Sequence, residues 1–588
     1  MKDFIFGTLA TEALRYRHVR TRRAGVSHSQ SREPRDPLPG QPIGLELSVG
    51  PDHPCKRAWV YWTNDGTDPS GSAGVASHGN VALMEIAELE WDTVLWGYIQ
   101  RYRAILPGQA AGTVLRYYLS VIGLDDKEIL ADQGCMYAFL VDNDPAPGWA
   151  KDAIIYQIFV DRFNPGKGRE WLQPAAPSGF YGGTIRGITE KLDYLSDLGV
   201  DVLWLTPIFP SPSHHGYDAT DLFEIEPRLG TKADLRALLD EAHKSGMRIL
   251  LDLVPNHVSN QHPTFQAALA DKHSPYASWF TFTHWPDQYQ SFFDVPELPQ
   301  LNLRVPGARQ HMLDAAVYWL EFGADGYRVD YALGPTPDFW ADFRRVTRQA
   351  QPECWTFGEV VEPPESQINF EGQLDGCLDF NLLEAFRMAF AYHTWDGSQF
   401  ASYLLRHEAY FPENFSRPSF LDNHDMNRFL WAAGGDVRRL RLAALCQFTL
   451  AGAPIIYYGT EVGLSQLRDV RQGELGLPEE SRLPMLWGKA QDQDLLGYYR
   501  SLIKMRNQHA ALSHAKVSLI RAVKEVVVYR KTGGDDLVIA LNLSEQSQSI
   551  VLPDNIKEVL VNTADGDATY HKRGITLSPM SGVVVLVG

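Results

Sequence analysis

The sequence has few cysteines, and none of them stands in a paired motif. Its 588 residues contain five cysteines, an odd number with no Cys-x-x-Cys spacing, at Cys55, Cys135, Cys354, Cys377 and Cys446. Disulfide frameworks and structural zinc sites both need cysteines grouped in pairs. We therefore expect reduced thiols, and neither a disulfide framework nor a structural zinc site.

The chain also lacks a surplus of positive charge and a long apolar run. It carries 54 Lys and Arg against 72 Asp and Glu, a formal net charge of −18, with no long basic run. That balance argues against nucleic acid or an anionic membrane as a partner and favours a neutral substrate. No run has the length of a membrane span, and the first apolar stretch is too short for a signal peptide and contains Glu12. We therefore expect a cytoplasmic protein.

The chain does have the length and apolar content for several cores, since 44% of its residues are hydrophobic and 11% are aromatic. Residues 1–145 carry short alternating runs such as AWVYWT and VLRYYLSVIG between turn-rich stretches, which predicts an N-terminal all-β sandwich domain. The Pro-rich stretch DNDPAPGWAKD marks its end. Residues 512–588 alternate again, as in DDLVIALNLS and GVVVLVG, and predict a C-terminal antiparallel β-domain.

Residues 146–511 alternate between apolar runs and amphipathic segments. We interpret eight apolar runs as strands: AIIYQIFVDRF, VDVLWLTPIF, MRILLDLVPNH, ADGYRVDYA, WTFGEVV, GCLDF, SFLDNHD and PIIYYGTE. Segments between them, such as ITEKLDYLSDLG, DLRALLDEAHKSG and ARQHMLDAAVYWLEFG, have apolar residues at helical spacing and end at glycine. Apolar strands separated by helices predict an α/β fold, a (β/α)8 TIM barrel. A long insert after the third strand, at about 258–306, is expected to overhang the barrel mouth.

Polar residues follow four of the predicted strands where these strands end: Asp252, Asn256 and His257; Arg328 and Asp330; Glu359; Asp422, His424 and Asp425. In such a barrel the catalytic groups lie at the carboxyl ends of the strands. A single carboxylate there is equally well explained by a buried salt bridge, but four strand ends that bring acids to one rim indicate catalysis. Arg328 and Asp330 are two residues apart on one strand, so they point the same way, and the arginine would keep the carboxylate ionised as a nucleophile requires.

The segments LDLVPNH, GYRVDYA, FGEVV and FLDNHD, in this order, resemble the four signature regions of the α-amylase superfamily, glycoside hydrolase family 13. HHGYDATDLFEIEPRLGT is similar to the family's Gly-Tyr-Asp segment, and LPQLNL to a fifth signature of the neopullulanase, cyclomaltodextrinase and maltogenic amylase group. The resemblance covers most of residues 150–510. It implies a retaining hydrolase of α-glucosidic bonds, mainly α-1,4 and also α-1,6, in maltooligosaccharides, cyclodextrins or pullulan-like glucans.

The resemblance also implies a role for each matching residue. Asp330 would be the nucleophile, Glu359 the general acid/base and Asp425 the third catalytic carboxylate. The implied substrate-binding residues are Tyr217, Asp218, His257, Arg328, His424 and Arg428, supported by Asp252 and Asn256. These roles agree with retaining glycoside hydrolysis, in which one carboxylate attacks and another donates a proton to the leaving oxygen. Glu359 suits the acid role because its apolar neighbours Phe357, Val360 and Val361 would raise its pKa.

The sequence departs from the family pattern directly after the implied nucleophile. The residues at 331–334, Tyr-Ala-Leu-Gly, stand where many amylases have a Lys-His pair that contacts the leaving-side sugar and supports a calcium site. The loop DRFNPGKGREW also lacks the dense Asp and Asn residues of a calcium loop. We therefore expect no metal and no other cofactor. Val360, Val361 and Glu362 replace the tryptophan common after the acid/base in neopullulanase-type members, which leaves the leaving-side specificity open.

The N-terminal region is rich in aromatic residues, among them Trp59, Tyr61, Trp62, Trp91 and Trp96. Such residues form either a sugar-stacking platform or the core of a β-sandwich, and the core is the more common use. The placement resembles the starch-binding-like N-terminal domain of neopullulanase relatives. That resemblance implies a carbohydrate-binding domain and a homodimer formed through it.

Two other functions stay open beside hydrolysis. A transglycosylase or isomerase would use the same glycosyl-enzyme intermediate but pass it to a sugar instead of water, and the sequence does not separate the two. An inactive amylase-like binding protein belongs to a different class. Relatives of that kind usually lose one of the three carboxylates, whereas Asp330, Glu359 and Asp425 are all present here.

Overall fold

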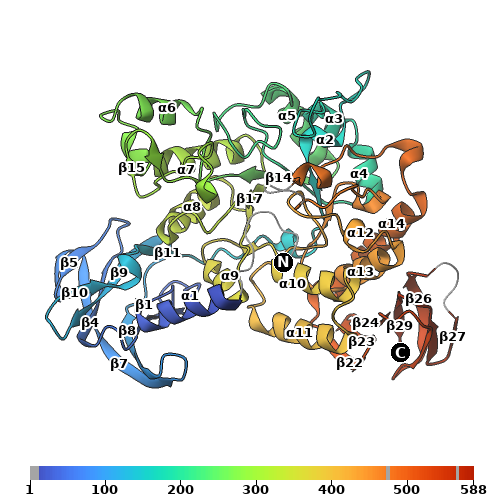
Figure 1. Ribbon diagram of the computed structural model, residues 1–588. Coiled ribbons are helices and arrows are strands. Elements are labelled where there is room, and N and C mark those ends of the chain that lie inside the picture. The colour runs from blue at the N-terminus through green and yellow to red at the C-terminus, as the bar shows by residue number, and fades with distance from the viewer. Residues whose placement is uncertain (1–11, 472–476, 565–568) are drawn as a thin grey trace.

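The computed structural model describes residues 12–471, 477–564 and 569–588, and at its centre lies a parallel sheet of eight strands curled into a barrel (Figure 1). Each predicted strand segment contains one of these strands: β12 (Ile155–Ile158), β13 (Val202–Leu205), β14 (Arg248–Leu253), β17 (Gly326–Val329), β18 (Trp355–Gly358), β19 (Gly376–Cys377), β20 (Ser419–Phe420) and β21 (Pro454–Tyr457). They run in the order β19-β18-β17-β14-β13-β12-β21-β20. At the remaining seam Gly376 bridges Ser416, and the Cys377 N–H donates to the Ser416 carbonyl over 3.0 Å. The predicted α/β barrel fold is confirmed.

Helices connect the strands and cover the barrel: α2 (Val160–Phe163), α3 (Ile185–Thr189), α4 (Leu192–Leu198), α5 (Lys232–Lys244), α7 (Pro306–Glu321), α8 (Pro337–Ala350), α9 (Pro364–Gln367), α10 (Phe380–Phe386), α11 (Gly397–Tyr410), α12 (Phe429–Ala432), α13 (Val437–Thr449), α14 (Gln493–Gln508) and α15 (Ala511–His514). Helix α5 begins at a capping box, in which Thr231 and Asp234 bond each other's backbone N–H. Its buried residues, Leu235, Leu238, Leu239 and Ala242, follow the helical spacing predicted for this segment. Within the described residues, no helix combines the length and the apolar character needed to cross a membrane.

A glycine sets the register that brings two acids together. Gly326 opens β17 with φ +153°, and a Cβ at this position would lie 2.0 Å from the Trp355 carbonyl oxygen on β18. Only glycine permits this approach. The two strands then pair from Gly326–Trp355 to Val329–Gly358. The residues that follow, Asp330 and Glu359, therefore leave neighbouring strands at the same level.

The insert after β14 folds over one side of the barrel mouth. It contains α6 (Pro263–Ala270) and a hairpin of β15 (Phe282–His284) and β16 (Gln288–Tyr289). The end of the insert pairs with its beginning through an antiparallel bridge between His257 and Gln300. Phe292 and Phe293, from the segment between the hairpin and this bridge, line the pocket described below. The expected overhang is therefore present.

The N-terminal region is an antiparallel sheet folded on itself at β7 (Asn80–Asp92). The first part of β7 pairs with β4 (Cys55–Thr63) and the second part with β8 (Gly97–Leu106). The two arms enclose a core that contains Leu45, Val60 and Leu119, as expected for a β-sandwich. The remaining strands are β1 (Val26–Ser27), β2 (Arg32–Glu33), β3 (Ile43–Val49), β5 (Ser70–Ser72), β6 (Val75–His78), β9 (Thr113–Gly123), β10 (Glu128–Leu130) and β11 (Tyr137–Val141). Residues 1–11 of the predicted N-terminal domain, including most of the stretch considered as a signal peptide, lie outside the described residues.

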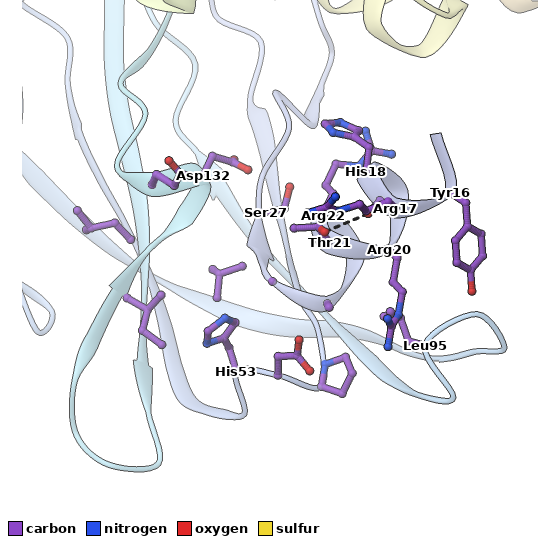
Figure 2. A pocket seen from close by; sticks show the side chains of 18 of the residues that line it. Tyr16, Arg17, His18, Arg20, Thr21, Arg22, Ser27, His53, Leu95 and Asp132 are labelled. Atoms are coloured by element: carbon purple, nitrogen blue, oxygen red, sulfur yellow. Dashed lines mark hydrogen bonds between the residues drawn. The ribbon is translucent and has the colours of Figure 1, made fainter. Parts of the chain in front are cut away.

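Helix α1 (Glu12–Ala24) lies beside this sheet and was not predicted from the sequence. A hollow of about 1360 Å³ separates the two, and Figure 2 shows Arg17, Arg20 and Arg22 of the helix around it. Two ion pairs hold the helix in place: Arg23 lies 2.9 Å from Asp92, and Arg22 lies 3.5 Å from Glu365 of α9. Helix α1 therefore connects the N-terminal sheet to the barrel.

The C-terminal region is a second antiparallel β-structure, as predicted. A five-stranded sheet, β22-β23-β24-β29-β26, faces a three-stranded sheet, β25-β28-β27. Val538 and Val585 of the first share a core with Ile550 and Ile575 of the second. The strands are β22 (Ser518–Val523), β23 (Val526–Gly533), β24 (Asp535–Asn542), β25 (Gln548–Val551), β26 (Ile556–Asn562), β27 (Thr569–His571), β28 (Gly574–Leu577) and β29 (Ser581–Val587).

Candidate active site

The carboxyl ends of the barrel strands meet around a pocket of about 490 Å³. Asp330 after β17, Glu359 after β18 and Asp425 after β20 line this pocket, together with Tyr217 and His257. The three acids are 7%, 8% and 5% exposed. The structure thus brings these five predicted residues, from separate strand ends, into one pocket.

Arg328 occupies the centre of the acidic cluster and is fully buried. Its NH1 lies 2.7 Å from Asp252 and 2.8 Å from Asp330. Its NH2 lies 2.9 Å from Glu359. The sequence predicts only the pair with Asp330, so the other two contacts are new. One positive charge faces three buried carboxylates, and full ionisation of all three would leave uncompensated negative charge in a medium that solvates it poorly.

Burial raises the pKa of all three carboxylates in this cluster, and Arg328 opposes the rise without cancelling it. The pKa is about 8 for Glu359, about 7 for Asp330 and about 6 for Asp252. Mutual repulsion between the acids adds to the effect of burial. The raised pKa of Glu359 agrees with the prediction from its apolar neighbours. For Asp330 the arginine does not hold the pKa down as predicted, because the loss of hydration outweighs its attraction.

A hydrogen-bonded chain holds the Tyr217 ring in place. Gln157 on β12 donates to Nδ1 of His424 over 2.8 Å, so Nε2 carries the ring proton. Nε2 donates to the Tyr217 hydroxyl over 2.7 Å, and this hydroxyl donates to Asp252 over 2.9 Å. The Tyr217 and His424 rings are parallel, with centroids 5.4 Å apart. Tyr217 therefore forms a fixed aromatic wall of the pocket.

His257 presents a free hydrogen-bond donor to the pocket. Asn256 donates to its Nδ1 over 3.2 Å, and Gln300 fixes that amide by donating to the Asn256 oxygen over 3.0 Å. Burial lowers the pKa of His257 to about 3, so the ring is neutral and its proton lies on Nε2. This nitrogen is buried and forms no hydrogen bond of standard geometry within the described residues, although the Tyr217 carbonyl lies near the ring and partly offsets the fall in its pKa. It is therefore available to a ligand hydroxyl.

Arg482 is a site residue that the sequence analysis missed. Its NH2 donates to Asp425 over 2.9 Å, and its Nε donates to the His424 carbonyl over 2.8 Å. It is 3% exposed and lines the pocket. It lies beyond β21 and outside every quoted motif, so no signal in the sequence marked it. Asp425 thus has an arginine of its own, separate from the Arg328 cluster.

Two predicted substrate-binding residues are turned toward the protein instead. Asp218 accepts from the Ser211 hydroxyl over 2.6 Å and so shapes the loop that carries Tyr217. Arg428 is fully buried and donates to the carbonyls of Ser481, over 3.0 Å, and Tyr458, over 2.6 Å. Neither residue lines the pocket. Asp218 is bonded by serine hydroxyls, and Arg428 is turned to backbone carbonyls through Nε and Nη1, so direct contact with substrate is corrected to a supporting place in the framework.

Another part of the pocket lining is apolar, and Phe292, Phe293, Tyr331, Leu333 and Val361 contribute to it. The Phe292 and Tyr331 rings lie 4.8 Å apart. Tyr331 has φ +38°, an uncommon conformation for a residue with a side chain. Its N–H donates to the Glu359 carboxylate over 3.3 Å. The absence of the Lys-His pair is legible in the sequence, whereas this aromatic wall is not.

The segment considered for calcium is engaged with the protein. Asp161 accepts from the backbone N–H groups of Tyr181 and Gly182, each over 2.9 Å, and lies 3.1 Å from Arg162. Across the three described ranges, no group of three or more His, Cys, Asp or Glu side chains is placed to hold a metal ion.

Known proteins share both the sequence and the fold. Residues 157–487 match the family described as "Alpha amylase, catalytic domain". Alpha-amylase 2 of Dictyoglomus thermophilum is 39% identical over 450 residues, 76% of this chain and 78% of that protein. A cyclomaltodextrinase of Geobacillus thermopakistaniensis is 35% identical over 73% of this chain and 75% of its own length. The solved type III pullulan hydrolase of Thermococcus kodakarensis superposes with a TM-score of 0.68 and 25% identity, covering 95% of this chain and 100% of that one.

Proposed function

Since this chain belongs to the α-amylase family, it is a retaining glycoside hydrolase of α-glucosidic bonds, and we propose that it acts on maltooligosaccharides, cyclodextrins and pullulan-like glucans. The bonds cleaved are mainly α-1,4 and also α-1,6. Relatives named cyclomaltodextrinase and pullulan hydrolase support these substrates. Residues of the overhanging insert line the pocket and narrow access to it, so short and cyclic glucans are expected to react faster than starch.

In the proposed first step, Asp330 attacks the anomeric carbon while Glu359 gives its proton to the glycosidic oxygen. A bond forms between the sugar and the carboxylate as the bond to the leaving sugar breaks. Burial keeps the pKa of Glu359 at about 8, so the proton is available near neutral pH. Both carboxylates contact Arg328, which supports the short separation of about 5 to 5.5 Å that a retaining pair needs.

In the proposed second step, water replaces the leaving sugar. Glu359, now ionised, takes a proton from the water, and the water oxygen attacks the anomeric carbon. The bond to Asp330 then breaks and the carboxylate is restored. The product keeps the α configuration because two displacements have occurred at one carbon.

The remaining site residues are proposed to bind the sugar at the cleaved position. Tyr217 stacks under the ring, and His257 donates from its unpartnered Nε2 to a sugar hydroxyl. His424, expected to bind the sugar directly, is fully buried with both ring nitrogens engaged, so it is proposed to act through Tyr217, which it holds in place. Asp425, held by Arg482, accepts from sugar hydroxyls and stabilises positive charge at the transition state.

The single observation that carries this proposal is the sharing of one buried guanidinium by Asp330 and Glu359. The test is a product time course on maltotriose, β-cyclodextrin, pullulan and starch, with the anomer of the new reducing end followed by NMR. We expect α-anomers first, and slower release from starch than from the short and cyclic substrates. First release of β-anomers would contradict the assignment of both carboxylates.

Transfer to a second sugar is the other candidate function, and the apolar wall around Phe293 and Tyr331 favours it. An apolar wall on the leaving side binds sugar faces and excludes water. The glycosyl-enzyme would then react with a sugar hydroxyl instead of water, as in a transglycosylase or isomerase. Products longer than the substrate early in the time course would identify transfer.

The N-terminal domain is proposed to bind carbohydrate and to form a homodimer. Trp91 and Trp96 are 44% and 78% exposed and support an exposed aromatic platform, whereas Tyr61 is buried in the core.

The proposed domains are residues 1–145, 146–511 and 512–588. The five cysteines, all free, support a reducing compartment, and we propose a cytoplasmic location. Sedimentation of the purified protein and binding of maltoheptaose to a Trp96→Ala variant test the dimer and the platform.

A further inference from the structure

A second hollow lies between α9 and α11. In Figure 1 these two helices lie on the side of the barrel next to α1. Its volume is about 800 Å³. One wall is the turn from Pro363 to Glu365, and the other is the face of α11 and the residue that precedes its cap, Trp395. This groove, as defined by these two walls, contains none of the residues assigned a catalytic or substrate-binding role above.

Aromatic side chains dominate the groove. Trp395 and Tyr403 pack against each other with ring centroids 5.5 Å apart, and both are half-buried. Tyr410 lies about two helical turns beyond Tyr403 on α11 and is 48% exposed. Flat aromatic faces that remain partly open are the surfaces on which sugar rings stack, because the C–H face of a pyranose is apolar.

Polar groups that could bond sugar hydroxyls stand between these rings without partners. Arg406 and Ser402 form no side-chain hydrogen bond or ion pair with any residue in the described ranges, and the same holds for the Tyr410 hydroxyl. By contrast, Asp396 and Gln399 are engaged in the capping box at the start of α11. A mixture of aromatic faces and free hydroxyl and guanidinium donors matches a neutral polyol better than an ion or an apolar ligand.

Consecutive residues of one segment line the catalytic pocket and then the groove. Val361 and Glu362 line the catalytic pocket, and the next three residues, Pro363 to Glu365, line the groove. This segment leaves the barrel directly from Glu359, the residue proposed to protonate the leaving oxygen. A sugar chain on the leaving side of the cleaved bond would therefore be directed over Glu362 toward α11.

We propose that the groove between α9 and α11 binds the leaving-side portion of a long α-glucan chain whose cleaved bond lies in the catalytic pocket. The proposal rests on the proposed hydrolytic function and adds to it a specificity for chain length. Trp395 and Tyr410 supply stacking faces, and Arg406 and Ser402 bond the sugar hydroxyls. Short substrates end before they reach this groove.

The test compares Tyr410→Ala with Tyr570→Ala in the full-length protein. Tyr570 lies in the C-terminal domain and is 46% exposed, so the control removes an equally exposed tyrosine. Tyr410→Ala should raise KM for maltoheptaose and longer amyloses by about tenfold, the scale of losing one aromatic anchor, with kcat nearly unchanged. Maltotriose kinetics should not change, and the control should match the wild type on every substrate. Trp395→Phe should retain most of the affinity that Trp395→Ala loses.

Two outcomes would overturn the proposal. Equal KM values for long amyloses in Tyr410→Ala and Tyr570→Ala would show that the groove does not bind the chain. If Tyr410→Ala leaves kinetics unchanged but converts a dimer to a monomer in sedimentation, the groove is an interface between copies. Failure of the wild type to cleave even maltotriose would instead contradict the proposed hydrolysis, and titration of maltoheptaose into both tyrosine variants would then decide the groove separately.

Discussion

Two of the clusters in which this protein places arginine among carboxylates differ in their balance of charge. At the active site, Arg328 alone faces three acids. Where the N-terminal sheet meets α8, Arg116 and Arg309 share two aspartates: Arg116 lies 2.6 Å from Asp338, and Arg309 lies 3.0 Å from Asp342. Each aspartate contacts both arginines.

The difference teaches how the same residue types serve structure in one place and chemistry in the other. In the interface cluster each aspartate has a positive partner, so the fully ionised form of the cluster is the stable one. In the catalytic cluster the acids outnumber the arginine, and burial therefore raises the pKa of each acid toward neutrality. An excess of acid is what allows a proton to move. Changes to the catalytic cluster should therefore reduce activity without reducing stability. Changes to the interface cluster should reduce stability without reducing activity.

The largest expected effect is that of Asp330→Asn. The variant should lose at least about 10⁴-fold in kcat on every substrate, since the amide cannot form the glycosyl-enzyme. Its stability should be unchanged or higher, because one acid is removed from an over-acidic cluster. Steady-state kinetics and urea unfolding measure the two properties. Residual turnover within tenfold of the wild type would mean that another group attacks.

Glu359→Gln should have the next largest effect and should depend on the leaving group. Hydrolysis of maltosides should fall by about 10³-fold, whereas α-glucosyl fluoride, whose leaving group needs little protonation, should still react. Added azide needs no general base, so it should intercept the intermediate and give an α-configured glycosyl azide. A β-configured azide product would indicate inversion and would exclude the assigned pair of roles.

In the interface cluster, Asp338→Asn should destabilise the protein without altering its chemistry. The change takes the most buried carboxylate away from the buried Arg116 and the half-buried Arg309, which costs about 3 kcal/mol, or roughly 100-fold in the unfolding equilibrium. Asp68→Asn is the matched control, because Asp68 also contacts Arg116, at 2.7 Å, but its side chain is 64% exposed. The control should lose less than about 1 kcal/mol. A drop in kcat for folded Asp338→Asn would break the separation of the two clusters.

The sequence predicts the barrel strands and the catalytic acids, but not the partners that these acids have in the folded protein. All eight barrel strands and the acids that follow them are legible, because apolar runs and helical spacing are local signals. The three carboxylates of the site could be predicted because each follows one of these strands. The partners of these acids are less legible: Arg482 comes from a distant loop, and the contacts of Arg328 with Asp252 and Glu359 exist only once the strands are in register.

Two errors have the same origin. Arg428 lies three residues beyond Asp425 and was expected at the substrate, but the chain turns there and the side chain is used to bond carbonyls in the protein. The pKa of Asp330 was expected to be held down by its arginine, but the degree of burial, which decides the balance, is a property of the packed barrel. Local sequence indicates which groups are present, whereas desolvation depends on everything packed around them.

The smallest expected effect, and the one that sharpens the comparison most, is the pH dependence of kcat/KM. Asp330 must be ionised, so activity should be lost as pH falls through its pKa of about 7. Glu359 must be protonated, so activity should be lost as pH rises through its pKa of about 8. The profile should therefore be bell-shaped with its maximum between these values, and each limb should approach about tenfold per pH unit. In Glu359→Gln, assayed with α-glucosyl fluoride, the alkaline limb should disappear and the acid limb should remain. Asp338→Asn should keep both limbs where the wild type has them, because its charges are balanced and take no part in proton transfer. A shift of either limb in that variant would show that the interface cluster sets the protonation of the site.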